Sequence, residues 1–123
     1  MNETKKIVIV EDEVLLSACL KMELEDEGYE VCGTFTTGEE AIKFMESTQP
    51  DAILMDINLV GKLDGIETAE VINEKLDIPI IFMTGYEEPE IYERAQKIKP
   101  PVAYLTKPVE IWDLEPIFES IFN

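Results

Sequence analysis

The alternation of short apolar runs with stretches of helical spacing constrains the fold of this chain more than any other feature. Five apolar runs are each followed by a segment in which apolar residues recur every three or four positions, and they lie at or near 7–10, 29–35, 52–55, 80–83 and 102–106. Strands with near-continuous apolar character are buried on both faces, as in a parallel sheet with helices on each side. The pattern therefore predicts an α/β fold in which right-handed crossovers wind helices over both faces of the sheet.

Turn and capping residues predict where the helices begin and end. Gly28 is a natural stop for the first helix. Thr37 and Glu40 have the spacing of a capping box at the start of the second helix. Asp64 can cap the third helix, and Pro89 fits the first turn of the fourth.

Prolines constrain the last strand and the last helix. The sequence Lys99-Pro100-Pro101 predicts an extended approach to the fifth strand. Pro116 is tolerated only near the start of a helix, because a proline deep inside costs about 3 kcal/mol. We therefore expect Asp113 to be the N-cap of the final helix and Ile111-Trp112 to form a turn before it.

Length and hydropathy predict one domain spanning residues 1–123, and no membrane partner. A chain of 123 residues is the size of a single domain with its own core. No apolar stretch approaches the roughly 20 residues that span a bilayer. Residues 1–6 lack the apolar segment and cleavage site of a signal peptide. We therefore expect a cytoplasmic protein.

Charge and cysteine content exclude two classes of function. The chain has 27 acidic and 10 basic residues, and its net charge of −17 repels nucleic-acid phosphate. We therefore expect no direct nucleic-acid binding. Cys19 and Cys32 are predicted to be buried thiols in a reducing compartment. A zinc site is not expected, because the chain has no histidine and no Cys-x-x-Cys motif.

Polar residues follow four of the five apolar runs directly. Glu11 and Asp12 follow the first run, Asp56 the third, Thr84 the fourth and Lys107 the fifth. In doubly wound folds, ligands bind beyond the carboxyl ends of the strands. If the runs are neighbouring parallel strands, three carboxylates, a hydroxyl and an ammonium group converge at one edge of the sheet.

This set of side chains predicts a cation site beside a nucleophilic carboxylate. Two unit charges about 4 Å apart repel by roughly 4 kcal/mol at an effective dielectric constant near 20, so clustered acids call for a cation or a proton. Hard oxygen ligands favour Mg²⁺, with Mn²⁺ as the alternative. Asp56 has the position of a nucleophile that forms an acyl phosphate, while Lys107 and Thr84 can bind the phosphoryl oxygens.

The motifs at these strand ends resemble those of response-regulator receiver domains of two-component signalling (CheY-like). They are Ile-Val-Ile-Val-Glu-Asp-Glu at 7–13, Ala-Ile-Leu-Met-Asp-Ile at 52–57, Leu-Asp-Gly-Ile-Glu at 63–67, Phe-Met-Thr-Gly at 82–85 and Tyr-Leu-Thr-Lys-Pro at 104–108. The resemblance implies that Asp56 accepts phosphate from the phosphohistidine of a histidine kinase. It implies that Glu11, Asp12 and Asp56 hold Mg²⁺ together with the backbone carbonyl of Asn58, and that Thr84 and Lys107 bind the phosphoryl group.

The resemblance also implies a switch. Tyr104 matches an aromatic position whose ring turns inward as Thr84 moves toward the phosphate, which changes the surface around the fourth helix, fifth strand and fifth helix. Asn58 and Tyr86 match positions that tune the lifetime of the phosphate. The loop 57–63 is one residue longer than the commonest family form and lacks its proline, and Glu11 stands where aspartate is commoner.

The predicted fold is therefore a doubly wound, flavodoxin-like, five-stranded parallel sheet of order 2-1-3-4-5 flanked by five helices. The predicted function is a phosphorylation-activated switch, which is a regulatory phosphoacceptor and not an enzyme with turnover on other substrates. Its partners would be a histidine kinase and a downstream protein or output domain, in a stand-alone regulator or a piece of a longer protein. A phosphorylation-dependent homodimer is allowed. The alternatives are a Mg²⁺-dependent phosphohydrolase with an aspartyl-phosphate intermediate and a constitutive scaffold.

Overall fold

One parallel sheet organises the part of the chain described by the computed structural model, which is residues 3–85, 88–97 and 101–123. Tyr86 and the pair Lys99-Pro100 lie outside these residues. The strand order β2-β1-β3-β4-β5 confirms the prediction, and every neighbouring pair is parallel. The strands are β1 (Lys6–Val10), β2 (Glu30–Phe35), β3 (Ala52–Asp56), β4 (Ile80–Thr84) and β5 (Pro101–Thr106).

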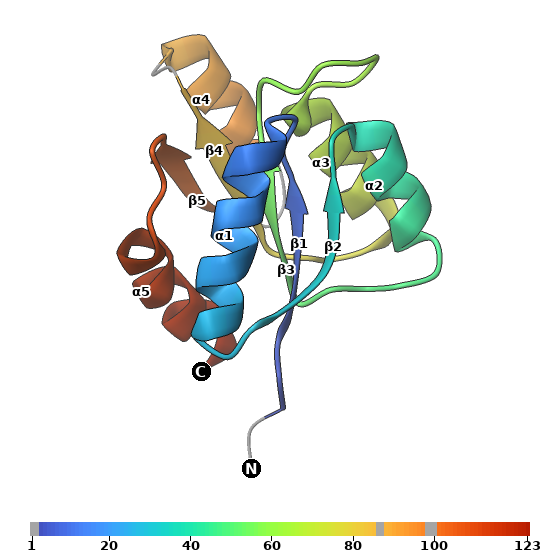
Figure 1. Cartoon of the computed structure of the whole chain (residues 1–123). Coiled ribbons are helices and arrows are strands. Elements are labelled where there is room, and N and C mark those ends of the chain that lie inside the picture. The colour runs from blue at the N-terminus through green and yellow to red at the C-terminus, as the bar shows by residue number, and fades with distance from the viewer. Residues whose placement is uncertain (1–2, 86–87, 98–100) are drawn as a thin grey trace.

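Helices cover both faces of the sheet, which confirms the doubly wound architecture. In Figure 1, α1 and α5 lie on one face, and α2, α3 and α4 lie on the other. The helices are α1 (Val14–Asp26), α2 (Gly38–Met45), α3 (Gly65–Lys75), α4 (Pro89–Gln96) and α5 (Ile111–Phe122). Among the helices so described, none combines the length and apolar character that crossing a bilayer requires.

The core has two layers because successive residues of each strand face opposite sides of the sheet. On β1, Ile7 and Ile9 pack with the α1 and α5 side, whereas Val8 and Val10 pack with the α2 and α3 side. All four side chains are fully buried. The central strands are thereby fixed in register, and their carboxyl ends share one edge of the sheet.

The predicted N-caps of α2 and α3 are present, although α2 has only the Thr37 half of the predicted capping box. The Thr37 hydroxyl oxygen accepts a hydrogen bond from the backbone N–H of Glu40 at the start of α2. Asp64 caps α3 by accepting from the N–H of Glu67, whose side chain accepts in return from the N–H of Asp64. Gly28 follows α1 with a φ of 94°, a left-handed conformation that favours glycine.

The prediction for the start of the last helix was wrong. Helix α5 begins at Ile111, so Pro116 lies inside it, and Asp113 is a first-turn residue whose Oδ2 accepts from the N–H of Glu110 at 2.9 Å. The proline removes one helical hydrogen bond. The added first turn offsets this cost, because Asp113 caps it at Glu110 and Ile111 packs against the core.

The prediction that both cysteines are buried was also wrong. Cys19 is exposed and Cys32 is partly buried, and both are free thiols. Helix α1 carries apolar residues on its outer side as well as its inner side, since Leu15 and Met22 are exposed while Leu20 is buried. Cys19 belongs to the outer side. In Cys32, burial raises the pKa of the thiol above its usual value.

Candidate functional site

The carboxyl ends of four strands bring the predicted polar residues to one edge of the sheet. Glu11 follows β1, Asp56 and Thr84 end β3 and β4, and Lys107 follows β5. The backbone N–H of Lys107 donates to the carbonyl oxygen of Thr84 at 2.7 Å. The Lys107–Pro108 peptide bond is cis. The shared edge follows from parallel pairing of the strands.

Three carboxylates meet at this edge. Glu11, Asp12 and Asp56 each present an oxygen, and these oxygens all lie within 4.8 Å of one another. Glu11 and Asp56 are only 1% exposed, and Asp12 is partly exposed. Because the three side chains offer only hard oxygen ligands and repel one another, this donor set fits Mg²⁺ or Mn²⁺. The fit agrees with the metal ligands expected from the sequence.

Lys107 reaches into the same cluster. Its Nζ lies 2.7 Å from Oε1 of Glu11 and 3.3 Å from Oδ2 of Asp56. Burial by itself would lower the pKa of Lys107, but the hydrogen bond to Glu11 and the charges of Asp56 and Glu11 outweigh it and raise the pKa. Lys107 therefore carries a full positive charge at the edge where the carboxylates meet.

Glu11 has a strongly perturbed carboxyl group. Its pKa is raised from 4.5 to about 7, mainly by burial and also by Asp56, although hydrogen bonds from Lys107 and from the N–H of Glu13 oppose the rise. The Glu13 N–H donates to Oε2 at 3.1 Å, so each Glu11 oxygen has its own contact. The position therefore favours a proton or a nearby cation at neutral pH.

The loop after β3 begins directly at Asp56. The N–H of Asn58 donates to Oδ1 of Asp56 at 3.0 Å, which places the exposed Asn58 beside the carboxylate. The N–H of Gly65 donates to the carbonyl oxygen of Ile57 at 2.9 Å and closes the loop. A Cβ at Gly65 would lie 2.8 Å from the carbonyl carbon of Asp56, so only glycine allows α3 to approach this closely.

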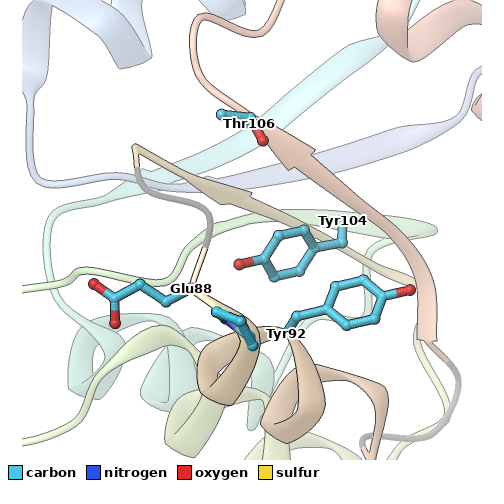
Figure 2. A pocket seen from close by; sticks show the side chains of 5 residues that line it. Glu88, Tyr92, Tyr104 and Thr106 are labelled. Atoms are coloured by element: carbon cyan, nitrogen blue, oxygen red, sulfur yellow. The ribbon is translucent and has the colours of Figure 1, made fainter.

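Tyr104 lies farther from the carboxylates, on β5. Its partly buried ring meets Tyr92 of α4 edge to face, with centroids 5.1 Å apart and planes at 76°. Figure 2 shows Glu88, Tyr92, Tyr104 and Thr106 around a surface pocket between α4 and β5. The aromatic residue is thus in contact with α4, at the surface that the sequence predicted to change.

The structure brings Glu11, Asp12, Asp56, Asn58 and Lys107 together, with Thr84 at the same edge and Tyr104 on the adjoining strand. Their roles in phosphoryl transfer and metal binding remain predictions. Sequence reasoning missed the part played by Gly65. The signal was present, since a glycine directly after the cap Asp64 stands where the helix would approach the strand end.

Comparison with known proteins gives a consistent result. Residues 7–119 match the response regulator receiver domain family. The transcriptional regulatory protein PdtaR of Mycobacterium tuberculosis is 36% identical over 115 residues, which is 94% of this chain and 55% of that protein. The chain therefore spans about half the length of this relative.

Two solved structures share the fold closely. The signal receiver domain of a modulated diguanylate cyclase from Desulfovibrio desulfuricans G20 is 39% identical with a TM-score of 0.89, covering 97% of this chain and 94% of that one. A CheY-like response regulator receiver domain protein from Methanospirillum hungatei JF-1 is 31% identical with a TM-score of 0.85, covering 98% and 95%.

Proposed function

This chain belongs to the family of response regulator receiver domains, and we propose that it is a phosphorylation-activated switch whose Asp56 accepts a phosphoryl group from a histidine kinase. The observation that carries the proposal is the surroundings of Asp56. Its carboxylate is buried, lies near those of Glu11 and Asp12, and has the ammonium group of Lys107 at 3.3 Å. This arrangement suits charge stabilisation during phosphoryl transfer.

The proposed reaction moves one phosphoryl group. An oxygen of the Asp56 carboxylate forms a bond to phosphorus while the bond from phosphorus to the donor's imidazole nitrogen breaks, and the electron pair of that bond leaves with the imidazole. The Asn58 N–H, at 3.0 Å from Oδ1, holds the carboxylate in place. The Lys107 ammonium and the Thr84 hydroxyl bind phosphoryl oxygens and offset the charge that develops on them.

Glu11, Asp12 and Asp56, with the backbone carbonyl of Asn58, would hold Mg²⁺ in this reaction, and Mn²⁺ could replace it. When bound, the ion supplies positive charge to a phosphoryl oxygen. Lys107 is shared between Glu11 and Asp56 at 2.7 and 3.3 Å. We propose that Lys107 transfers its contact from Glu11 to the phosphoryl group when Asp56 is modified.

The proposed output is a change at the surface of α4, β5 and α5. Thr84 would move toward the phosphoryl group and the Tyr104 ring would turn with it, altering its contact with Tyr92. The relative PdtaR is named as a transcriptional regulatory protein and is longer than this chain. By that analogy the partner is a downstream protein or an output domain, and phosphorylation-dependent pairing of two copies is one form the output can take.

Intact-mass measurement tests the proposal directly. We expect acetyl phosphate with Mg²⁺ to add one phosphoryl group per chain, and we expect no adduct with Asp56→Asn or with EDTA. Turnover of many phosphomonoesters would favour the phosphohydrolase instead, although Asn58 stands where such enzymes usually have a second aspartate. No adduct from acetyl phosphate, phosphoramidate or a phosphorylated kinase would refute the switch and favour a scaffold.

A further inference from the structure

The loop between β3 and α3 runs past the first turn of α2, where the carboxylate of Glu39 accepts a hydrogen bond from it. Oε1 of Glu39 accepts a hydrogen bond from the backbone N–H of Leu63 at 3.0 Å. Oε2 lies 3.1 Å from the point where a Cβ on Gly61 would stand. Gly61 has a φ of 111°, so glycine both permits this backbone conformation and leaves room for the carboxylate.

Two hydrogen bonds from backbone N–H groups hold the ends of this loop, and between them the Leu59 side chain is buried in the core. The Asn58 N–H donates to Asp56, and the Gly65 N–H donates to the carbonyl oxygen of Ile57. Between these ends the chain includes the exposed residues Asn58, Val60, Gly61 and Lys62 and contains no proline. Ordering each such residue costs about 1–2 kcal/mol of backbone entropy. The hydrogen bond from Leu63 to Glu39, which ties the loop to a separate helix, therefore strongly restricts the conformations that the loop adopts.

We infer that Glu39 is a positioning residue for the metal-binding loop. It holds the backbone at Leu63 in place and thereby limits the conformations of the loop segment that carries the Asn58 carbonyl. The inference rests on the proposed function, because it takes that carbonyl as a metal ligand.

Helix α2 is a rigid support for this contact. Thr37 caps the helix, and Gly38 lies against Thr68 of α3 so closely that a Cβ would collide with the Thr68 side chain. The Thr68 hydroxyl in turn donates to the carbonyl oxygen of Asp64 at 2.7 Å. Glu39 therefore extends from a helix that is packed against the far end of the same loop.

The test compares Glu39→Ala, Glu39→Gln and the control Glu70→Ala, which removes the same charge from an exposed site on α3. Two readouts are measured by NMR: the Mg²⁺ dissociation constant from chemical-shift titration, and hydrogen exchange of the Leu63 amide in metal-free protein. Circular dichroism checks that each variant is folded.

We expect Glu39→Ala to weaken Mg²⁺ binding about tenfold, the lower end for loss of a group supporting a ligand, and to speed exchange at Leu63. Glu39→Gln keeps an acceptor oxygen and should stay within about threefold of wild type. Unchanged binding and exchange in Glu39→Ala would overturn the inference. Equal losses in both variants would also overturn it, because charge rather than the tether would then be responsible.

Failure of the proposed function gives a different result. In that case the wild-type protein itself would show no Mg²⁺ binding and no adduct with acetyl phosphate, and the positioning inference would be refuted with it. If wild type and Glu70→Ala bind Mg²⁺ alike and only Glu39→Ala is weakened, the function and the inference both stand.

Discussion

We expect Glu11 to destabilise the metal-free fold at neutral pH, so that replacing it with glutamine raises the free energy of unfolding. Burial is the largest influence on this carboxyl group and raises its pKa from 4.5 to about 7 in the folded protein. Between these two pH values the folded state binds more protons than the unfolded state. Stability contributed by this group therefore falls as the pH rises through that window and is constant above it.

The size of this destabilisation follows from the rise in the Glu11 pKa from 4.5 to about 7. Each pKa unit corresponds to about 1.4 kcal/mol, so ionised Glu11 costs the fold about 3 kcal/mol above pH 7 and almost nothing below pH 4.5. The opposing contribution of the Lys107 hydrogen bond is already included in the raised value. Glutamine of similar size lacks the ionisation and so lacks the pH-dependent cost.

Urea unfolding in EDTA at about pH 5 and about pH 8 measures this for wild type and Glu11→Gln. The other ionisable groups are common to both proteins and largely cancel in the difference. We expect the free energy of unfolding of Glu11→Gln, relative to wild type, to increase by about 2–3 kcal/mol from about pH 5 to about pH 8. A variant that is less stable at pH 8, or a difference independent of pH, would show that the pairing with Lys107 outweighs burial. Added Mg²⁺ should stabilise wild type more than the variant.

Further predictions concern packing and contacts around the site. Gly65→Ala should lower the free energy of unfolding by about 2 kcal/mol or more, because its Cβ would press on the backbone of Asp56. It should also slow labelling by acetyl phosphate. Urea denaturation measures the first effect and intact mass the second. Phe118→Ala should cost about 3–5 kcal/mol in urea unfolding, since the ring is fully buried, and a cost under 1 kcal/mol would contradict its place in the core. Arg94→Ala removes a partly exposed ion pair to Asp64 at 3.1 Å, so its cost should stay below about 1 kcal/mol.

Most of the fold could be predicted from the sequence because local and global signals agree. The apolar run at 52–55 became β3, buried at all five positions, and Asp64 caps α3 as its spacing suggested. The start of α5 could not be predicted, because the local penalty of Pro116 is offset by the packing of Ile111 against the core and by the Asp113 cap at Glu110. That packing depends on what lies opposite the helix, which a local pattern does not contain.

Some residues of the site could be predicted from local sequence patterns, whereas others depend on contacts between distant parts of the chain. Residues at strand ends could be identified because parallel strands end at a common edge, and this rule needs only the strand assignments. Glu39 and Gly65 were missed because their roles depend on the path of the loop after β3 and on its distance from α2. The contact of Lys107 with Glu11 was missed for a related reason, since the position of a long side chain depends on the depth of its partner.

The charge at this edge links the pH dependence to metal dependence. Three ionised carboxylates and one ammonium group leave a local charge of about −2, which a divalent cation matches. A phosphoryl group on Asp56 adds further negative charge, so without the cation the product would be disfavoured more than the starting state. A proton on Glu11 relieves the same repulsion while removing one of the proposed metal ligands. Protons and Mg²⁺ should therefore compete, and the apparent Mg²⁺ affinity should fall as the pH drops below about 7. A titration in which that affinity is unchanged from about pH 8 to about pH 6 would refute this coupling.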